Sequence, residues 1–313
     1  MKELVSIIVP VYRAESYIAK TIAMAEAQTW QDWELLLIDD CSPDGSAEAI
    51  RRILKKNTGK IAWDANLESA RDAAIASEVS DNVSEGYCGN GSAGGTEEGQ
   101  TACLRESGIR TVEEYSGIRG QRIVLICKEM NEGAARARNI GLELAQGRYI
   151  SFLDADDVWY PDKLEKELRF MRDRQAGFVF TAYEFGDEQA RPVGKVVHVP
   201  EKLTYRQALS RTVIFTTTVL FDRERIPSEL IRMPVVESED TATWWQILRA
   251  GYTAYGLDEV LAVYRRPAQS LSSNKLTAIR RIWNLYRRQE KLSLPESACC
   301  FIMWAYRATV RRL

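Results

Sequence analysis

Short β-rich apolar runs alternate with helical patterns along much of the chain. The runs are LVSIIVP near the start, ELLLIDD after it, RIVLIC at residues 122–127 and YISFL at residues 149–153. Apolar residues at helical spacing lie between them, as in SAEAIRRILKK and EGAARARNIGLELAQ. Strands that alternate with helices predict an α/β fold with a largely parallel sheet. Ligands of such sheets bind beyond the carboxyl ends of the strands.

Two acidic clusters stand at those strand ends. Asp39 and Asp40 close the second run, and FLDADD places Asp154, Asp156 and Asp157 directly after YISFL. Carboxylates this close together repel one another and raise each other's pKa unless a cation neutralises them. Their oxygens suit Mg²⁺ or Mn²⁺, which also bind phosphate oxygens. The pattern therefore favours a metal–diphosphate ligand, although Asp157 could instead cap the next helix.

The composition argues against several classes of protein. With 313 residues, 45% of them hydrophobic, the chain can bury a full core, as one large domain or one domain plus an appendage. A formal net charge of -2 argues against a general nucleic-acid binder. MKELVSIIVP runs straight into a strand pattern without the features of a signal peptide, and no apolar run approaches the ~20 residues that cross a bilayer.

The cysteines and the single histidine argue against a zinc site. The six cysteines show no CxxC pair, and His198 is the only histidine. A reduced, cytoplasmic setting fits this cysteine usage best. His198 could approach a metal, but KVVHVP matches no ligand motif, so a structural role is favoured.

Between residues 64 and 117 the composition changes. EVSDNVSEGYCGNGSAGGTEEGQTA is rich in Gly, Ser and Glu, and we interpret the segment as a surface insertion or a disordered loop. It contains GNGSAG, in which Gly89, Gly91 and Gly94 have the G-x-G-x-x-G spacing of a dinucleotide-binding loop. That loop requires a strand before it and a helix after it, and neither pattern is present here, so we reject a Rossmann fold.

The last segment, from Lys275 on, is basic and aromatic. Its only acids are Glu290 and Glu296. One interpretation is a helical hairpin that covers the edge of the sheet. A compatible one is a basic amphipathic surface that rests on anionic lipid headgroups. The residues behind both are Arg280, Arg281, Trp283, Tyr286, Arg287, Arg288, Lys291, Trp304, Tyr306, Arg307, Arg311 and Arg312.

Three longer motifs together resemble the family 2 glycosyltransferases, which have the GT-A fold. They are VSIIVPVYRAESYIAKTIAMAEAQTWQDWELLLIDDCSPDGS, then NEGAARARNIGLELAQGRYISFLDADDVWYPDKLEKEL, then ESEDTATWWQILRAGYTAYGLDEVLAVYRR. The resemblance covers about residues 3–60 and 121–270. It implies a GT-A domain over residues 1–270, interrupted at about 64–117, with a helical tail at 271–313. The tail looks, more narrowly, like that of enzymes of teichuronic-acid and capsular-polysaccharide assembly.

The resemblance implies a nucleotide site at the first two strand ends. Pro10, Val11 and Tyr12 would line the pocket, with Tyr12 near the base. Asp40 would accept a hydrogen bond from uracil N3–H, which favours a UDP or dTDP donor because cytosine has no proton on N3. Asp39 is interpreted mainly as a solvated strand end.

The second motif is expected to hold the diphosphate and its metal. Gly133 precedes a helix whose free N–H groups can bind phosphate. Arg138 could offer phosphate a forked cation, or form an ion pair on the helix surface. The resemblance implies that Asp156 is the first ligand of Mn²⁺ or Mg²⁺. Asp154 would contact the ribose or a metal-bound water.

The third motif is expected to supply the catalytic base. Transfer with inversion requires a carboxylate to take the proton of the acceptor hydroxyl. ESED contains Glu237, Glu239 and Asp240; the family's motif matches Glu239-Asp240, and Asp240 is the predicted base. Glu237 is expected only to favour the helix start. Trp244 and Trp245 could form an acceptor platform, although tryptophans on a helix are more often core.

The sequence therefore predicts an inverting, metal-dependent glycosyltransferase. Its partners would be a UDP-sugar donor and a glycan or polyprenyl-linked acceptor, used on the cytoplasmic side in surface-polysaccharide synthesis. A sugar-nucleotide pyrophosphorylase is less well supported, because VPVYRAESY lacks the glycine-rich phosphate loop of those enzymes. A non-catalytic sugar-nucleotide-binding protein is the third alternative.

Overall fold

The computed structural model describes residues 3–57, 108–265 and 275–310. Within them, eleven strands form one mixed sheet in the order β3-β4-β2-β1-β5-β10-β7-β11-β6, with β8 beside β7 and β9 beside β11. The strands are Val5–Val11 (β1), Trp33–Asp39 (β2), Ile109–Ser116 (β3), Arg122–Lys128 (β4), Tyr149–Phe152 (β5), Val158–Trp159 (β6), Phe178–Gly186 (β7), Pro192–Val197 (β8), Lys202–Leu203 (β9), Val219–Asp222 (β10) and Ala254–Arg265 (β11).

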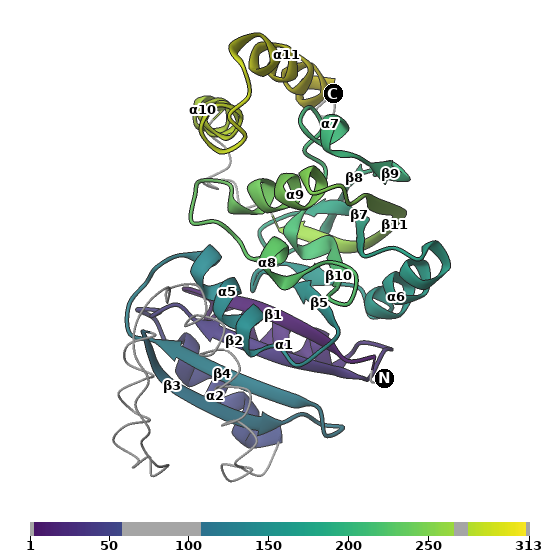
Figure 1. The fold of residues 1–313 in the computed structure, drawn as a ribbon. Helices are drawn as coiled ribbons and strands as arrows, with labels where there is room; N and C mark the ends of the chain where they lie inside the picture. Colours follow the sequence, from purple (N-terminus) through teal and green to yellow (C-terminus); the bar gives the residue numbers. More distant parts are fainter. Residues whose placement is uncertain (1–2, 58–107, 266–274, 311–313) are drawn as a thin grey trace, which may run out of the picture.

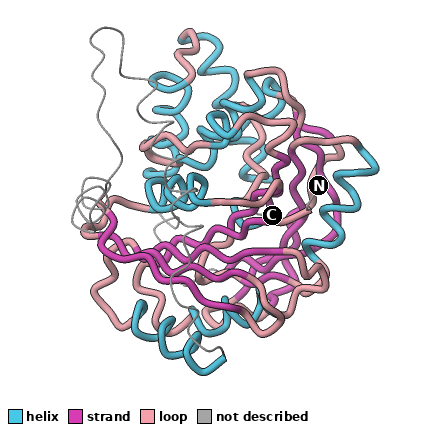
Figure 2. The backbone as a smooth tube through the Cα atoms, turned by 60° about the horizontal axis from the view of Figure 1, so that its bottom comes forward, coloured by secondary structure: helices cyan, strands magenta, loops and turns pink. Residues whose placement is uncertain are grey.

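Helices lie on both sides of this sheet, which runs through the molecule as one twisted layer (Figures 1 and 2). They are Ile18–Glu26 (α1), Ser46–Asn57 (α2), Ala134–Leu144 (α5), Lys163–Arg174 (α6), Tyr205–Ala208 (α7), Ser228–Ile231 (α8), Glu239–Arg249 (α9), Lys275–Asn284 (α10) and Leu294–Val310 (α11). A 3₁₀ turn, η1 (Thr216–Thr218), and a π-helical segment, η3 (Leu285–Gln289), complete the described elements.

The four strands predicted from apolar runs are all present and mutually parallel. β1 pairs in parallel with β2 and β5, and β2 with β4. Their residues are almost all buried, because helices cover both faces of the sheet. Beyond β5 the sheet is mixed, since β10 runs antiparallel to β5 and β7, while β11 runs parallel to β7. The parallel half therefore places four carboxyl ends on one edge, where the site lies.

One expected boundary is wrong. Residues 109–116, counted in the stretch expected as an insertion, form β3, which pairs antiparallel with β4. The remainder of that stretch up to residue 107 lies outside the described residues, as does the glycine motif within it. Its interpretation as an insertion stays a prediction.

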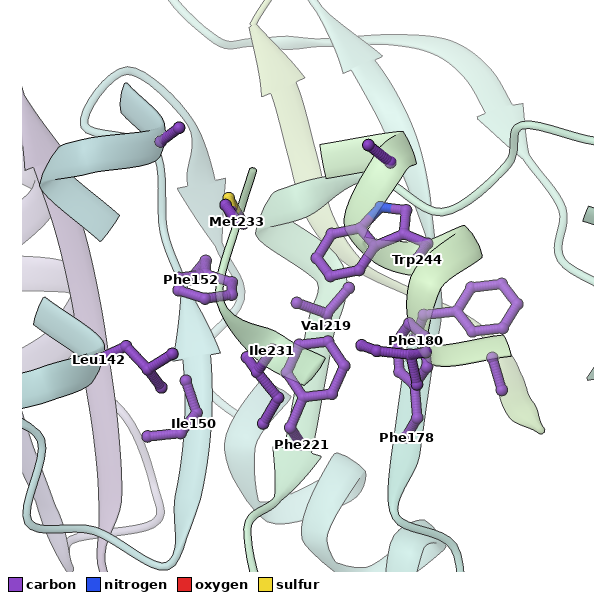
Figure 3. Close-up of a cluster of buried hydrophobic side chains, with 14 of the residues drawn as sticks. Leu142, Ile150, Phe152, Phe178, Phe180, Val219, Phe221, Ile231, Met233 and Trp244 are labelled. Carbon is purple, nitrogen blue, oxygen red and sulfur yellow. The ribbon is translucent and has the colours of Figure 1, made fainter. Parts of the chain in front are cut away.

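Two apolar cores fill the space between the sheet and its helices. Figure 3 shows the one beneath α9, where Trp244 lies over Phe221 and Phe178, with ring centroids 5.5 and 5.6 Å away. α5 packs against β1 and β2 through Gly141, where a Cβ atom would come within 2.9 Å of Ile38 Cδ1. This close approach brings α5, and the arginine one turn earlier on it, near the sheet edge.

The C-terminal helices pack on other helices rather than on the sheet edge. Tyr286 stacks on Trp245 of α9 at 5.3 Å with the rings 6° from parallel, and its hydroxyl donates to the carbonyl oxygen of Leu209, just after α7. In Figure 1, α10 and α11 lie at the end of the molecule opposite β3 and β4. Among residues 3–57, 108–265 and 275–310, no helix combines the length and the apolar character that a membrane span requires.

Candidate active site

The loops beside the predicted site residues adopt left-handed backbone conformations. Arg13 and Cys41 follow the ends of β1 and β2 with φ of 53° and 56°, and Gly133 precedes α5 with φ of 91°. Ser238, directly before Glu239, has φ of 61°. Such conformations cost energy for residues other than glycine and concentrate at functional sites. Four separate segments thus turn sharply at the edge where the predicted residues lie.

Arg138 joins the acidic triplet, which is Asp154, Asp156 and Asp157, to the Glu239-Asp240 pair. Its Nη2 donates to Asp154 Oδ1 at 2.5 Å, and its Nη1 donates to Glu239 Oε1 at 3.1 Å. Arg138 is only 5% exposed. Burial opposes its charge, but the carboxylates of Asp154 and Glu239 outweigh that effect and raise its pKa. The guanidinium therefore bridges two carboxylates in this structure; the phosphate contact expected for it stays a prediction.

Asp156 lies beside Arg265, at the end of β11. Arg265 Nη2 donates to Asp156 Oδ2 at 3.1 Å, and the guanidinium lies 3.6 Å from the ring centroid of Tyr17. Burial and the charge of Asp154 raise the pKa of Asp156, and Arg265 partly opposes them. The side chain of Asp156 is 44% exposed. Of the triplet, it is the carboxylate most open to a ligand.

Asp157 has a structural role different from the one expected. Its Oδ2 accepts from Thr217 Oγ1 at 2.6 Å and its Oδ1 from the backbone N–H of Arg265 at 3.2 Å. It does not cap a helix, because strand β6 follows it and α6 begins only at Lys163. Burial and the charges of Asp154 and Asp156 raise its pKa well above the usual range. Asp157 thus ties the triplet to η1 and β11.

The predicted base lies at the first turn of α9. Asp240 accepts a 2.6 Å hydrogen bond from its neighbour's N–H, at Thr241, and a longer one of 3.4 Å from Thr216 Oγ1. Burial, followed by the charge of Glu239, raises the pKa of Asp240. Glu237 is exposed. Asp240 is therefore a carboxylate with a raised pKa, and it is next to Glu239, which Arg138 links to Asp154.

Asp40 fixes the loop that leads into α5. Lys128 Nζ donates to its Oδ1 at 2.5 Å, and the N–H groups of Glu132 and Gly133 donate at 3.1 and 2.7 Å. Asp40 is buried, so its carboxylate is already engaged by protein donors. Contact with a nucleobase through its remaining lone pairs stays a prediction.

Asp39 is buried, which contradicts its interpretation as a solvated strand end. It is 1% exposed, and its Oδ1 has no hydrogen-bond partner among the described residues. Burial raises its pKa, while hydrogen bonds from Ser42 oppose the shift. A buried carboxylate oxygen without a donor is costly, so a ligand that donated a hydrogen bond to it would remove that cost.

The three residues at the end of β1 differ in what they expose. Tyr12 is 46% exposed and its ring faces the guanidinium of Arg13 at 5.4 Å. Pro10 is half-buried. Val11 is fully buried, and its carbonyl oxygen accepts from the N–H of Asp40 at 2.9 Å. A pocket here would contact the Tyr12 ring but not the Val11 side chain.

Burial decides the role of the two tryptophans of α9, and position decides the role of His198. Trp244 and Trp245 are 2% and 1% exposed, so an acceptor platform on them is wrong and the core interpretation is confirmed. His198 is exposed and contacts Asp258 at 3.0 Å. Asp258 lies seven residues before Arg265 on β11, roughly 20 Å away along a strand. His198 is therefore remote from Asp156.

The donor set fits a divalent cation held jointly with phosphate. Among the residues that the structure describes, no three His, Cys, Asp or Glu side chains form a metal-binding group. Asp154 and Asp156 offer hard oxygens, and burial together with the charge of Asp154 raises the pKa of Asp156. Mg²⁺ commonly binds one or two carboxylates and completes its coordination with substrate phosphates and water. The chemistry of the two carboxylates fits that mode.

Several residues of the site were not identified from the sequence. Thr216 and Thr217 contact Asp240 and Asp157 from η1, and Lys128, Tyr17 and Arg265 contact other members. Thr217 also accepts from the N–H of Asp154 at 3.3 Å through Oγ1. The sequence offered two signals for these residues: the run of three threonines before β10, and the arginine that ends β11. Neither has a spacing that points to a ligand.

Solved structures with a similar fold are glycosyltransferases. Staphylococcus aureus TarS, residues 1–349 in complex with UDP-GlcNAc, superimposes with a TM-score of 0.58 at 15% identity, covering 97% of this chain and 72% of that one. The mannosyltransferase PcManGT of Pyrobaculum calidifontis, in complex with GDP-Man and Mn²⁺, gives 0.59 at 18% identity, covering 96% and 69%. These likenesses show the fold, which is GT-A, as predicted.

The relatives by sequence define the family. The model of glycosyl transferase family 2 matches residues 6–76 and 109–222. The "Putative teichuronic acid biosynthesis glycosyltransferase TuaG" of Bacillus subtilis is 35% identical over 313 residues, 100% of this chain and 98% of that protein. Escherichia coli WfgD, "UDP-Glc:alpha-D-GlcNAc-diphosphoundecaprenol beta-1,3-glucosyltransferase", is 29% identical over 283 residues, 90% and 85% of the two chains. The chain belongs to glycosyl transferase family 2 and is a glycosyltransferase; the pyrophosphorylase and non-catalytic alternatives are not favoured.

Proposed function

We propose that the protein is an inverting, metal-dependent enzyme that moves a sugar from a UDP-sugar to a hydroxyl of a lipid-linked glycan during surface-polysaccharide synthesis. The observation that carries this proposal is the Arg138 bridge. It brings Asp154 of the triplet and Glu239, next to Asp240, to the two ends of one guanidinium. A donor site and a base must lie this close together if an acceptor hydroxyl is to attack the anomeric carbon.

The donor would bind at the carboxyl ends of β1, β2, β4 and β5. Tyr12 presents an exposed ring on which a uracil could stack. Asp39 Oδ1, which has no hydrogen-bond partner among the described residues, and the engaged Asp40 carboxylate lie at the adjoining end of β2 and would be acceptors for a base N–H. UDP is supported as the nucleotide because WfgD is named for UDP-Glc and TarS was solved with UDP-GlcNAc.

Asp156 and Asp154 are the residues that would hold Mn²⁺ or Mg²⁺ together with the diphosphate. The bound cation would stabilise the leaving phosphates. The neighbour PcManGT was solved with Mn²⁺, which supports the same assignment. Arg265 opposes the rise that burial causes in the pKa of Asp156, and so favours the ionised, metal-binding form of this carboxylate. The first turn of α5, which follows Gly133, would offer its backbone N–H groups to phosphate, whereas the N–H of Gly133 itself donates to Asp40.

Asp240 would take the proton of the acceptor hydroxyl. Its pKa is raised by burial and by Glu239, and a carboxylate base works best when its pKa lies nearer to the working pH. Thr216, through its hydroxyl, and Thr241, through its N–H, hold the carboxylate in place. A single displacement at the anomeric carbon, with no covalent intermediate, inverts its configuration.

The acceptor is proposed to be a glycan on a polyprenyl diphosphate at the cytoplasmic face of the cell membrane. WfgD is named for an acceptor on diphosphoundecaprenol, and TuaG for teichuronic acid biosynthesis. These names support a membrane-bound acceptor for this chain as well.

Release of UDP from UDP-sugars, with Mn²⁺ and a lipid-linked GlcNAc acceptor, tests the proposal. We expect acceptor-dependent UDP release that falls by about 10²–10⁴-fold in Asp240→Asn, with UDP binding retained. Glu237→Gln, an exposed neighbour in the same motif, is the matched control and should keep its activity. The proposal fails if Asp240→Asn is as active as Glu237→Gln, or if no sugar is transferred to any lipid-linked acceptor.

A further inference from the structure

The outward face of α11 is an apolar surface that nothing in the described chain covers. Leu294, Ile302 and Tyr306 are 62%, 66% and 65% exposed, and Met303 is 42% exposed. These four are among eleven large apolar side chains that are exposed in the part of the chain the structure describes, and Ile279 of α10 is a fifth. Scattered exposed apolar residues are ordinary, but a concentration on one helix marks an interaction surface.

These side chains form one stripe along the helix. Pro295, Ala298 and Cys299 are also exposed, so the exposed positions recur at intervals of three and four residues from 294 to 306. We call this set the α11 stripe. A helix rises about 1.5 Å per residue, so the stripe is roughly 18 Å long. It contains no charged side chain.

The opposite face of α11 is already occupied by the protein. Phe301 and Trp304 pack against the core that also contains Trp244, and Phe301 lies edge-on to Trp283 of α10 at 5.8 Å. Trp304 Nε1 donates to Thr212 Oγ1 at 3.1 Å, and Arg307 Nη1 donates to Ser210 Oγ at 2.9 Å. The helix is thus fixed to the body with its second apolar face directed outward, at the end of the molecule opposite β3 and β4 (Figure 1).

The charges of the C-terminal segment and of α7 indicate what covers the stripe. Residues 275–313 carry nine Lys and Arg against two Glu, although the whole chain has a net charge of -2. Of the two acids, Glu290 is buried and pairs with Arg249 at 2.6 Å. Glu296 is exposed, and its pKa is lowered by Ser293 and, more weakly, by Arg206. Exposed positive charge is contributed by Arg206, Arg280, Arg288 and Lys291.

We propose that the α11 stripe enters the headgroup–acyl boundary of an anionic lipid bilayer, with exposed basic side chains of α7, α10 and the segment before α11 on the lipid phosphates. Apolar side chains flanked by Lys and Arg are the composition of helices that lie in a membrane interface. Each basic residue near an anionic leaflet adds to the attraction. A second copy of this chain is the less suitable occupant, because it would bring a like-charged surface against this one. This inference deepens the proposed work at a membrane, but it does not depend on sugar transfer.

The test is co-sedimentation of the full chain with vesicles, one set of phosphatidylcholine alone and one with added phosphatidylglycerol. We expect binding to the anionic vesicles that weakens with salt, and a loss of about tenfold in Ile302→Ser/Tyr306→Ser. Arg280→Gln/Arg288→Gln should weaken binding to anionic vesicles and reduce its salt dependence. Ile118→Ser/Val193→Ser removes side chains of similar exposure, 65% and 57%, from the β3–β4 connection and from β8, and should bind as the unchanged protein does.

Two readouts make the result decisive. Thermal unfolding and UDP binding, measured on every variant, show whether the fold and the proposed donor site persist, so failure of the membrane inference is separable from failure of the proposed function. The inference is overturned if the unchanged protein ignores anionic vesicles, or if Ile302→Ser/Tyr306→Ser binds them equally well. It is also overturned if light scattering shows a dimer that this variant converts to a monomer, because a second copy then covers the stripe.

Discussion

Arg138 is the residue on which the geometry of the site depends most. Its planar guanidinium is buried and spans Asp154 and Glu239, with one ion pair to each carboxylate. A lysine carries the same charge but has one ammonium group, which cannot reproduce a forked pair of hydrogen bonds. The identity of the residue, and not only its charge, therefore matters.

Arg138→Lys is expected to lower the stability by about 1–3 kcal/mol, because one carboxylate loses a charged hydrogen bond. Activity should fall by about 10²-fold, since the triplet and the base are no longer held in register. Arg136→Lys, on the same helix but exposed, is the control and should behave like the unchanged protein. Denaturant unfolding and UDP release measure the two effects. Full activity in Arg138→Lys would show that the bridge does not position the site.

The pH profile should report on Asp240. Its pKa is raised, so the carboxylate becomes protonated, and the reaction slows, at a higher pH than an ordinary Asp with pKa near 3.9 would give. Glu239→Gln removes the neighbouring negative charge that raises this pKa. We expect the acidic limb of kcat/KM to move to lower pH.

Glu237→Gln is the control for that profile, because Glu237 is exposed in the same segment. Its acidic limb should coincide with that of the unchanged protein. An acidic limb that stays in place in Glu239→Gln would mean that the titrating group is not Asp240.

At the scale of elements, α6 contains a buried ion pair behind the triplet. Lys163 Nζ and Glu167 Oε2 are 2.6 Å apart with both side chains fully buried, and Lys163 lies 4.2 Å from the ring centroid of Trp159 in β6. Burial lowers the pKa of Lys163, against the opposing charge of Glu167. Burial raises the pKa of Glu167 to about 7, against the opposing charge of Lys163. Each group limits the cost of burying the other.

Lys163→Met should destabilise the protein in a pH-dependent way. Methionine keeps the stem over Trp159 but leaves Glu167 without its cation, so the folded-state pKa of Glu167 rises further. A raised carboxyl pKa contributes stability that is complete below the unfolded pKa, near 4.3, and is lost as the pH rises through the folded value. We therefore expect a small cost at pH 5 and about 3–5 kcal/mol at pH 9, measured by urea unfolding.

Lys166→Met provides the comparison on the same helix. The side chain of Lys166 is 41% exposed and pairs with Asp162 and Glu259, so its loss should cost less than about 1 kcal/mol at either pH. A pH-independent cost for Lys163→Met would contradict the assignment of the titration to Glu167.

At the scale of the whole molecule, the sequence predicts the parallel half of the fold and the location of the site. β1, β2, β4 and β5 are buried on both faces, which produces the continuous apolar runs that identify them. Their carboxylates follow directly in sequence, so the shared edge is predictable. The mixed half is less so, because β6 and β9 have two residues each and carry no periodic pattern.

The connections within the site are what the sequence does not predict. Arg138 meets Asp154 16 residues away and Glu239 101 residues away, and Thr217 meets Asp157 60 residues away. Such contacts depend on how β10, η1 and α9 pack onto the edge, and no local spacing encodes them. Burial of Asp39 is a similar case, since a strand end looks solvated until helices and loops cover it.

The central claim is that the end of β5 holds a nucleotide diphosphate together with a metal, and calorimetric titration of UDP tests it most directly. We expect binding in Mn²⁺ that weakens at least about tenfold with chelator and in Asp156→Ala. Asp258→Ala, which removes an exposed carboxylate of β11 remote from the triplet, should bind UDP normally. Binding that is indifferent to both metal and Asp156 would contradict the claim and make the acidic triplet a purely structural feature.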